Sequence, residues 1–171
     1  MTSEPLSPAD VAIVERQLGR TPRGMVSVAH RCPCGAPDVV RTLPRLPDGT
    51  PFPTTFYLTC PRASGAIGTL EAGGLMREME ARLGDDAELA SQYAAAHDAY
   101  LADRAELGAV AEIDGISAGG MPNRVKCLHV LVAHSLAAGA GVNPLGDEVV
   151  AALGPWWAAN PCCTLDEDEA T

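Results

Sequence analysis

Residues 25–60 read MVSVAHRCPCGAPDVVRTLPRLPDGTPFPTTFYLTC, a segment that contains three short β-strand patterns in succession. We expect strands at 25–32, 38–43 and 54–60, since hydrophobic side chains alternate along the first and the third. Proline and glycine crowd residues 46–53 and indicate a loop between the second strand and the third. Because the connections are short, the strands should form an antiparallel meander.

The remainder of the chain has the hydrophobic spacing of helices. Helices are expected at 8–20, 63–83, 86–107 and 122–138, and a last one from 148. Gly73 and Gly74 are a weak point within the second helix, and a glycine-punctuated linker follows the third. The sequence therefore predicts an α+β fold, in which a small antiparallel three-stranded meander is covered by about five helices.

The length of 171 residues is typical of a single domain with one core. We expect a flexible N-terminus at 1–7, the α+β domain at 8–160 and an acidic C-terminal tail at 161–171. The formal net charge of −10 argues against a nucleic-acid-binding protein, which normally presents a basic face. Neither a signal sequence nor a long apolar segment is visible, so we expect a cytoplasmic protein that does not bind a membrane.

The chain has six cysteines, and four of them lie beside expected turns and helix starts. Thiols stay reduced in the cytosol, so such cysteines are more often ligands or nucleophiles than disulfides. Cys32 and Cys34 follow the first expected strand, and Cys60 ends the third. Because the first and third strands of a meander run in the same direction, these three side chains should meet at one edge of the sheet.

A fourth thiol would come from Cys127, in the second turn of the helix expected from Pro122. Four thiolates suit a tetrahedral zinc ion or an iron–sulfur cluster. We therefore predict a metal site formed by Cys32, Cys34, Cys60 and Cys127. Substitute or additional ligands are His30, His129, Cys162 and Cys163.

Two other interpretations of the cysteines are open. Cys60 and Cys127 are inert if they are simply small core residues, since free cysteine is among the most buried residue types. Alternatively, Cys34 or Cys60 is the nucleophile of a metal-free enzyme. Cys60 precedes an expected helix start, where exposed N–H groups and Arg62 would lower its pKa, and His30 or His129 would act as the base.

A glycine-containing loop precedes the helix expected at 122–138. Backbone N–H groups at a helix N-terminus, with the positive end of the helix dipole, favour a phosphate or carboxylate group. We predict a site for a small anionic ligand formed by Ser117, Gly119, Gly120, Arg124 and Lys126, with Arg62 beside it. The alternative is an ordinary loop followed by a solvated basic helix start.

Two further histidines lie on expected helices. His134 lies between Leu131 and Leu136, and His97 shares its helix with two tyrosines. Both are expected to be hydrogen-bonded core residues rather than ligands.

Several motifs are spread over nearly the whole chain: HRCPCG at 30–35, LPDGTPFPT at 46–54, LTCP at 58–61, GGMP at 119–122, RVKCLH at 124–129 and GVNPLGD at 141–147. In these motifs the chain resembles a bacterial family, common in actinobacteria, that is catalogued as domain of unknown function five-oh-one. The resemblance implies a cytosolic housekeeping role. Genes of that family often lie near those of a cell-division protein, enolase and an exopolyphosphatase, which implies a partner in cell division or an anionic ligand.

Together these features predict a cytosolic protein with a zinc or iron–sulfur site of cysteines beside an anion-binding helix N-terminus. Such a protein would be a small metalloenzyme acting on a phosphate or carboxylate substrate. The alternatives are a non-catalytic adaptor associated with cell division and a metal-free cysteine-dependent enzyme.

Overall fold

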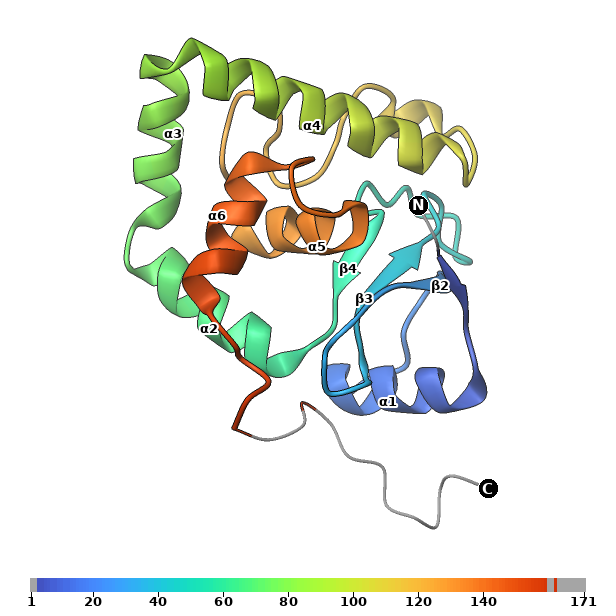
Figure 1. Ribbon diagram of the computed structural model, residues 1–171. Coiled ribbons are helices and arrows are strands. Elements are labelled where there is room, and N and C mark those ends of the chain that lie inside the picture. The colour runs from blue at the N-terminus through green and yellow to red at the C-terminus, as the bar shows by residue number, and fades with distance from the viewer. Residues whose placement is uncertain (1–2, 160–161, 163–171) are drawn as a thin grey trace.

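An antiparallel sheet of four strands lies at one side of the structure, and helices pack around it (Figure 1). The structure is a computed structural model that describes residues 3–159 and 162. In both chain and sheet order the strands are β1 (Glu4–Pro5), β2 (Met25–Arg31), β3 (Pro37–Thr42) and β4 (Phe56–Leu58). The helices are α1 (Pro8–Leu18), α2 (Pro61–Ala72), α3 (Leu75–Asp85), α4 (Ala87–Ala105), α5 (Leu128–Ala138) and α6 (Pro144–Leu153), with a short 3-10 helix at Ala111–Ile113.

The antiparallel meander predicted for residues 25–60 is confirmed as β2, β3 and β4. The predicted number of strands is wrong, because β1 adds a fourth strand with no hydrophobic pattern of its own. Glu4 of β1 lies opposite Val28 of β2, and the Arg31 guanidinium donates to the Glu4 carboxylate at 2.6 Å. The same guanidinium donates to Asp10 in the first turn of α1 at 2.7 Å. One side chain therefore holds the N-terminal segment to the sheet.

All six residues of β3 are buried. Val39 belongs to the main hydrophobic core together with Phe56 and Leu128. Val40 points to the opposite face, where it lines a small pocket with Leu18 of α1. Because β3 is covered on both faces, it is the central strand around which the rest of the sheet is arranged.

The described residues form six α-helices rather than about five, because the helix expected at 63–83 divides into α2 and α3. The break lies at the two glycines that weaken the pattern. Gly74 has a φ of 92°, a left-handed conformation that glycine adopts without strain. The last helix also begins earlier than expected, at Pro144, where the Asn143 side chain accepts a hydrogen bond from the Gly146 N–H.

The helix expected from Pro122 begins only at Leu128. The preceding residues form turns, in which the Lys126 N–H donates to the Gly119 carbonyl at 2.8 Å. Gly120 has a φ of 97°, and a Cβ at this position would lie 2.8 Å from the Arg124 carbonyl oxygen, so the turn requires glycine. The correction matters because it places Cys127 at the N-terminus of α5.

The helix α5 lies at the centre of the fold, packed against α2, α6 and the sheet (Figure 1). It is apolar on all sides, and its buried residues are Leu128, Leu131, Val132, Ala133, His134, Ser135 and Ala137. The His134 ring stacks on Phe56, with 5.7 Å between ring centroids, and the Asn143 amide lies 3.3 Å from its Nδ1. This environment confirms the expectation that His134 is a core residue.

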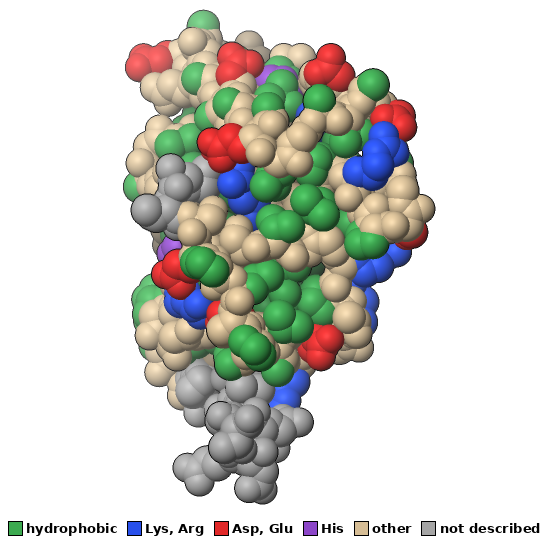
Figure 2. All heavy atoms as spheres, turned by 90° about the vertical axis from the view of Figure 1, so that its right-hand side faces the viewer, with side chains coloured by type: hydrophobic (Ala, Val, Ile, Leu, Met, Phe, Trp, Pro, Cys, Tyr) green, Lys and Arg blue, Asp and Glu red, His purple; other side chains and the backbone are tan. Residues whose placement is uncertain are grey.

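The surface seen from the right-hand side of Figure 1 has hydrophobic side chains gathered along its centre (Figure 2). Acidic and basic side chains are interspersed around them on this face. Among the residues that the structure describes, none of the helices combines the length and the hydropathy needed to span a bilayer.

The first prediction concerns His134, whose burial lowers its pKa to about 4. An unfolded histidine has a pKa of about 6.5, so between these two values the unfolded chain binds a proton that the folded protein does not. The free energy of unfolding should therefore fall as the pH is lowered from about 6.5 to about 4. In His134→Gln the part of this fall that lies between pH 7.5 and 5 should shrink by about 2 kcal/mol. Urea unfolding followed by circular dichroism at pH 7.5, 6 and 5 measures it, and an unchanged pH dependence in the variant would contradict it.

Candidate metal centres

Two groups of potential metal ligands occur among the described residues. In each group, one ligand atom from every residue lies within 4.8 Å of those of the other two. The first, which we name the thiol cluster, consists of Cys32, Cys34 and Cys162. The second, which we name the mixed-ligand group, consists of Glu71, Cys127 and His129.

The thiol cluster is built on the turn between β2 and β3. The Cys32 N–H donates to the Ala36 carbonyl at 3.0 Å, and the Gly35 N–H donates back to the Cys32 carbonyl at 2.8 Å. Gly35 permits this tight turn through a φ of 92°. Cys162 comes from the chain beyond α6, and its Sγ lies 3.2 Å from that of Cys34. Two segments far apart in the sequence thus bring three thiols together.

The three thiols have different pKa values. Burial raises the pKa of Cys32 to about 11 and also raises that of Cys162. Burial opposes ionisation of Cys34 as well, but hydrogen bonds from the backbone N–H groups of Cys162 and Ala36 and from the neighbouring thiols outweigh it and lower its pKa to about 7. Cys34 is therefore the thiol of this cluster that ionises first.

Cys60 lies beside the thiol cluster. It is the N-cap residue of α2, and its Sγ accepts a hydrogen bond from the Ala63 N–H at 3.5 Å. The fully buried Cys60 packs in one hydrophobic group with Cys32 and Cys162. Its sulfur is not among those that lie within 4.8 Å of one another. The predicted gathering of cysteines at the end of β2 and β4 therefore includes Cys60 as a neighbour.

Cys127 does not join the other predicted ligands, and this differs from the four-cysteine set expected from the sequence. The physical reason is the late start of α5, which turns Cys127 toward the last turn of α2. There its Sγ lies 3.8 Å from His129 Nδ1, which is itself 3.3 Å from the Glu71 carboxylate. Cys127 and His129 were expected from the sequence as metal ligands, whereas Glu71 was not.

In the mixed-ligand group the pKa values of His129 and Cys127 are shifted in opposite directions. The hydrogen bond with Cys127 raises the pKa of His129 to about 9; burial opposes this effect, and the Glu71 charge adds to it. Burial pushes the pKa of the Cys127 thiol upward, but hydrogen bonds from His129 and from the Val130 N–H outweigh burial and lower it. The group thus combines a stabilised thiolate, an imidazole and a carboxylate at one point.

The anion site predicted at residues 117–126 depended on a helix N-terminus at Pro122, and the structure has no helix start there. The expected helix N-terminus lies instead at Cys127, and there the Leu128 N–H donates to the Glu71 carboxylate at 2.7 Å. The chain supplies its own anion at this helix end. Ser117 is buried and forms a hydrogen bond with His97. Arg124 pairs with Glu80 on the surface. Gly119 lies close to the side chains of Val130 and Leu131. Lys126 is exposed, and Arg62 lies in the first turn of α2.

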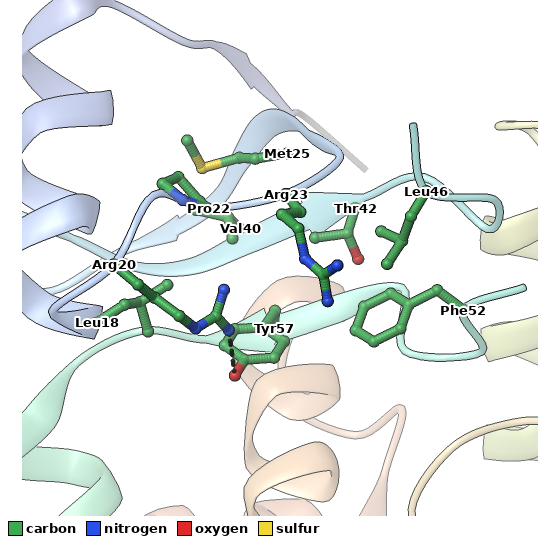
Figure 3. A pocket seen from close by; sticks show the side chains of 10 residues that line it. All are labelled: Leu18, Arg20, Pro22, Arg23, Met25, Val40, Thr42, Leu46, Phe52 and Tyr57. Carbon is green, nitrogen blue, oxygen red and sulfur yellow. Dashed lines mark hydrogen bonds between the residues drawn. The ribbon is translucent and has the colours of Figure 1, made fainter. Parts of the chain in front are cut away.

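A separate pocket between α1 and the sheet contains two arginines (Figure 3). The Arg20 guanidinium donates to the Tyr57 hydroxyl at 3.3 Å, and Arg23 pairs with Asp48 at 3.0 Å. The cavity measures about 140 Å³, smaller than typical pockets for small-molecule ligands. Because both guanidinium groups have internal partners and the volume is small, we do not assign a ligand to it.

The architecture is that of an α+β protein with two clusters of metal-ligating side chains. A profile of the family described as "Protein of unknown function (DUF501)" matches residues 28–151, and the chain belongs to this family, as the sequence motifs predicted. Neither a curated protein nor a solved structure matched the chain. The matched segment contains the whole mixed-ligand group, whereas Cys162 of the thiol cluster lies beyond it.

The second prediction concerns the reactivity of the thiol cluster. In the reduced, metal-free protein at pH 7.5, iodoacetamide should modify Cys34 more than about tenfold faster than Cys32, since the thiolate is the reactive form. Timed alkylation with peptide mapping by mass spectrometry measures both rates. Cys34→Ser should remove the fast site and leave Cys32 slow, because burial is the largest cause of the raised pKa of Cys32. Equal rates at the two positions would contradict the assignment.

Proposed function

We propose that this protein is a zinc-binding protein in which the thiol cluster, with Cys60 as the fourth ligand, holds one ion. The observation that carries the proposal is the approach of three cysteine sulfurs, from the β2–β3 turn and from residue 162, to within 4.8 Å of one another. Four thiolates are a common ligand set of structural zinc sites. The proximity of the buried Cys60 supports it as the residue that completes the set.

The spacing of the sulfurs favours a single ion over an iron–sulfur cluster. With Zn–S bonds of about 2.3 Å, sulfurs at neighbouring corners of a tetrahedron are about 3.8 Å apart. The 3.2 Å between the sulfurs of Cys34 and Cys162 is about 0.6 Å shorter than this edge and much longer than the roughly 2.05 Å of a disulfide bond, so a small separation of the two thiols would admit one ion. In an iron–sulfur cluster the four cysteines are divided among two or four irons, so they cannot all lie at the corners of one tetrahedron around a single ion.

The electrostatics of the cluster also support a cation. Burial, followed by the neighbouring Cys34, Cys60 and Cys32, raises the pKa of the Cys162 thiol. Several thiolates cannot be gathered in such an environment unless a positive charge compensates them. A zinc ion would supply that charge and displace the protons.

The burial of the site supports a structural role. Cys32 and Cys60 are fully or almost fully buried, and Trp156 and Trp157 pack against the same group. A closed site of this kind leaves no position for a substrate and stabilises the fold instead. Here it would tie the chain after α6 to the β2–β3 turn and to the first turn of α2.

The third prediction tests this site by metal content. Protein purified anaerobically should contain zinc, and Cys34→Ser and Cys32→Ser should each lose about one equivalent and unfold at lower temperature. Elemental analysis and thermal unfolding measure the two effects. Cys127→Ser is the matched control and should retain the ion of the thiol cluster. A zinc content unchanged by Cys34→Ser, or a brown iron-containing protein, would contradict the proposal.

A further inference from the structure

The mixed-ligand group is independent of the thiol cluster and is built at the contact between α2 and α5 (Figure 1). Glu71 lies in the last turn of α2, Cys127 is the N-cap residue of α5, and His129 lies in its first turn. The three residues provide a carboxylate, a thiolate and an imidazole, each an established ligand of zinc.

The distances agree with a single tetrahedral ion. Bond lengths of about 2.3 Å to sulfur and about 2.0 Å to nitrogen and oxygen give edges of about 3.5 Å between sulfur and nitrogen and about 3.3 Å between nitrogen and oxygen. The structure has 3.8 Å between Cys127 Sγ and His129 Nδ1, and 3.3 Å between His129 Nδ1 and the Glu71 carboxylate. Two of the three edges therefore lie within about 0.3 Å of the expected lengths, and all three ligand atoms lie within 4.8 Å of one another.

The outer hydrogen bonds orient the ligands. His129 Nε2 donates a hydrogen bond to the Ser64 carbonyl oxygen at 3.2 Å, so a neutral His129 directs its Nδ1 lone pair toward Cys127 and Glu71, and metal binding would displace the Nδ1 proton. A backbone carbonyl on the second ring nitrogen is typical of metal-binding histidines. The Leu128 N–H holds one Glu71 oxygen at 2.7 Å, which fixes the carboxylate in turn.

The same geometry argues against a metal-free catalytic triad. In a triad the nucleophile and the carboxylate contact opposite nitrogens of the histidine, which can then pass a proton between them. Here Cys127 and Glu71 both approach Nδ1, and Nε2 is occupied by a backbone carbonyl. An arrangement in which all three groups face one point is that of a metal site.

The mixed-ligand group is open on one side, unlike the thiol cluster. The side chains of His129 and Glu71 are 29% and 22% exposed. Cys127 and His129 line a pocket of about 300 Å³, together with Thr54, Phe56, Tyr57, Leu58, Ser64 and Val130. Three protein ligands and one free position that faces a pocket form the usual arrangement of a catalytic zinc site.

The geometry points to a second zinc site at Glu71, Cys127 and His129, whose fourth position takes an exchangeable ligand from the adjacent pocket. In the absence of another ligand this position would hold a water molecule, whose pKa zinc lowers toward about 7. The partly exposed apolar side chains of Leu58 and Val130 suit a small molecule that has a hydrophobic body and one oxygen or nitrogen donor for the ion.

The fourth prediction is tested in full-length Cys34→Ser protein, in which the thiol cluster is disabled. Under anaerobic conditions it should bind one equivalent of Co²⁺ with the absorption of a cobalt–thiolate bond, and Zn²⁺ should displace it. His129→Gln and Glu71→Gln should each weaken Co²⁺ binding by at least about 100-fold. Glu71→Gln keeps an oxygen that can accept the Leu128 N–H bond, so it removes the charge with little change in packing. Glu78→Gln, an exposed carboxylate change on α3, is the control and should bind like the parent.

Azide probes the free position and should alter the visible spectrum of the Co²⁺ protein. Folding of each variant is checked by circular dichroism. The inference is overturned if the folded Cys34→Ser protein binds no Co²⁺, if folded His129→Gln and Glu71→Gln bind it like the parent, or if azide leaves the spectrum unchanged. The two proposed zinc sites are tested by different variants. If the thiol cluster binds no zinc, Cys34→Ser keeps the zinc content of the wild type. If the mixed-ligand group binds no zinc, Cys127→Ser keeps the zinc content of the wild type.

Discussion

The hydrogen bond from the Leu128 N–H to the Glu71 carboxylate joins the end of α2 to the start of the central helix. Because Leu128 is fully buried at the start of α5, its N–H needs an acceptor within the protein. A carboxylate satisfies this need and also interacts favourably with the positive end of the helix dipole. The contact sets the position of Cys127 and His129, so the chemistry of this region depends on it.

Much of the fold could be predicted because its signals are local. The alternation of hydrophobic residues and the short loops in 25–60 define the meander, and the glycines at 73–74 mark the break between α2 and α3. β1 could not be predicted, since its two residues pair with β2 and Glu4 is held by Arg31, contacts that are made only in the folded chain. Pro122 is a typical helix-start residue, but here it belongs to a turn closed by the hydrogen bond from Lys126 to Gly119.

The cysteines also divide into those whose positions follow from local sequence signals and those whose positions depend on contacts of the folded chain. Cys32, Cys34 and Cys60 could be placed near one another because the meander topology alone brings their strand ends together. Cys127 was expected in that group because the helix that carries it was expected to cover the same edge of the sheet, whereas in the structure Cys127 lies beside Glu71 of α2 and His129. Glu71 had no such signal in the helix expected at 63–83; only the break after Ala72 places its carboxylate in a last turn, where the helix dipole disfavours it and a partner outside its own helix is needed.

The shortness of β1 has a consequence for how copies of the protein behave toward one another. An outer strand with a long row of unpaired N–H and C=O groups is a template for intermolecular β-pairing and aggregation. β1 consists of two residues, one of them Pro5, which has no N–H to donate, and the charged pair of Glu4 and Arg31 lies beside it. This edge of the sheet therefore disfavours pairing with a strand of a neighbouring molecule, which reduces aggregation at high protein concentration.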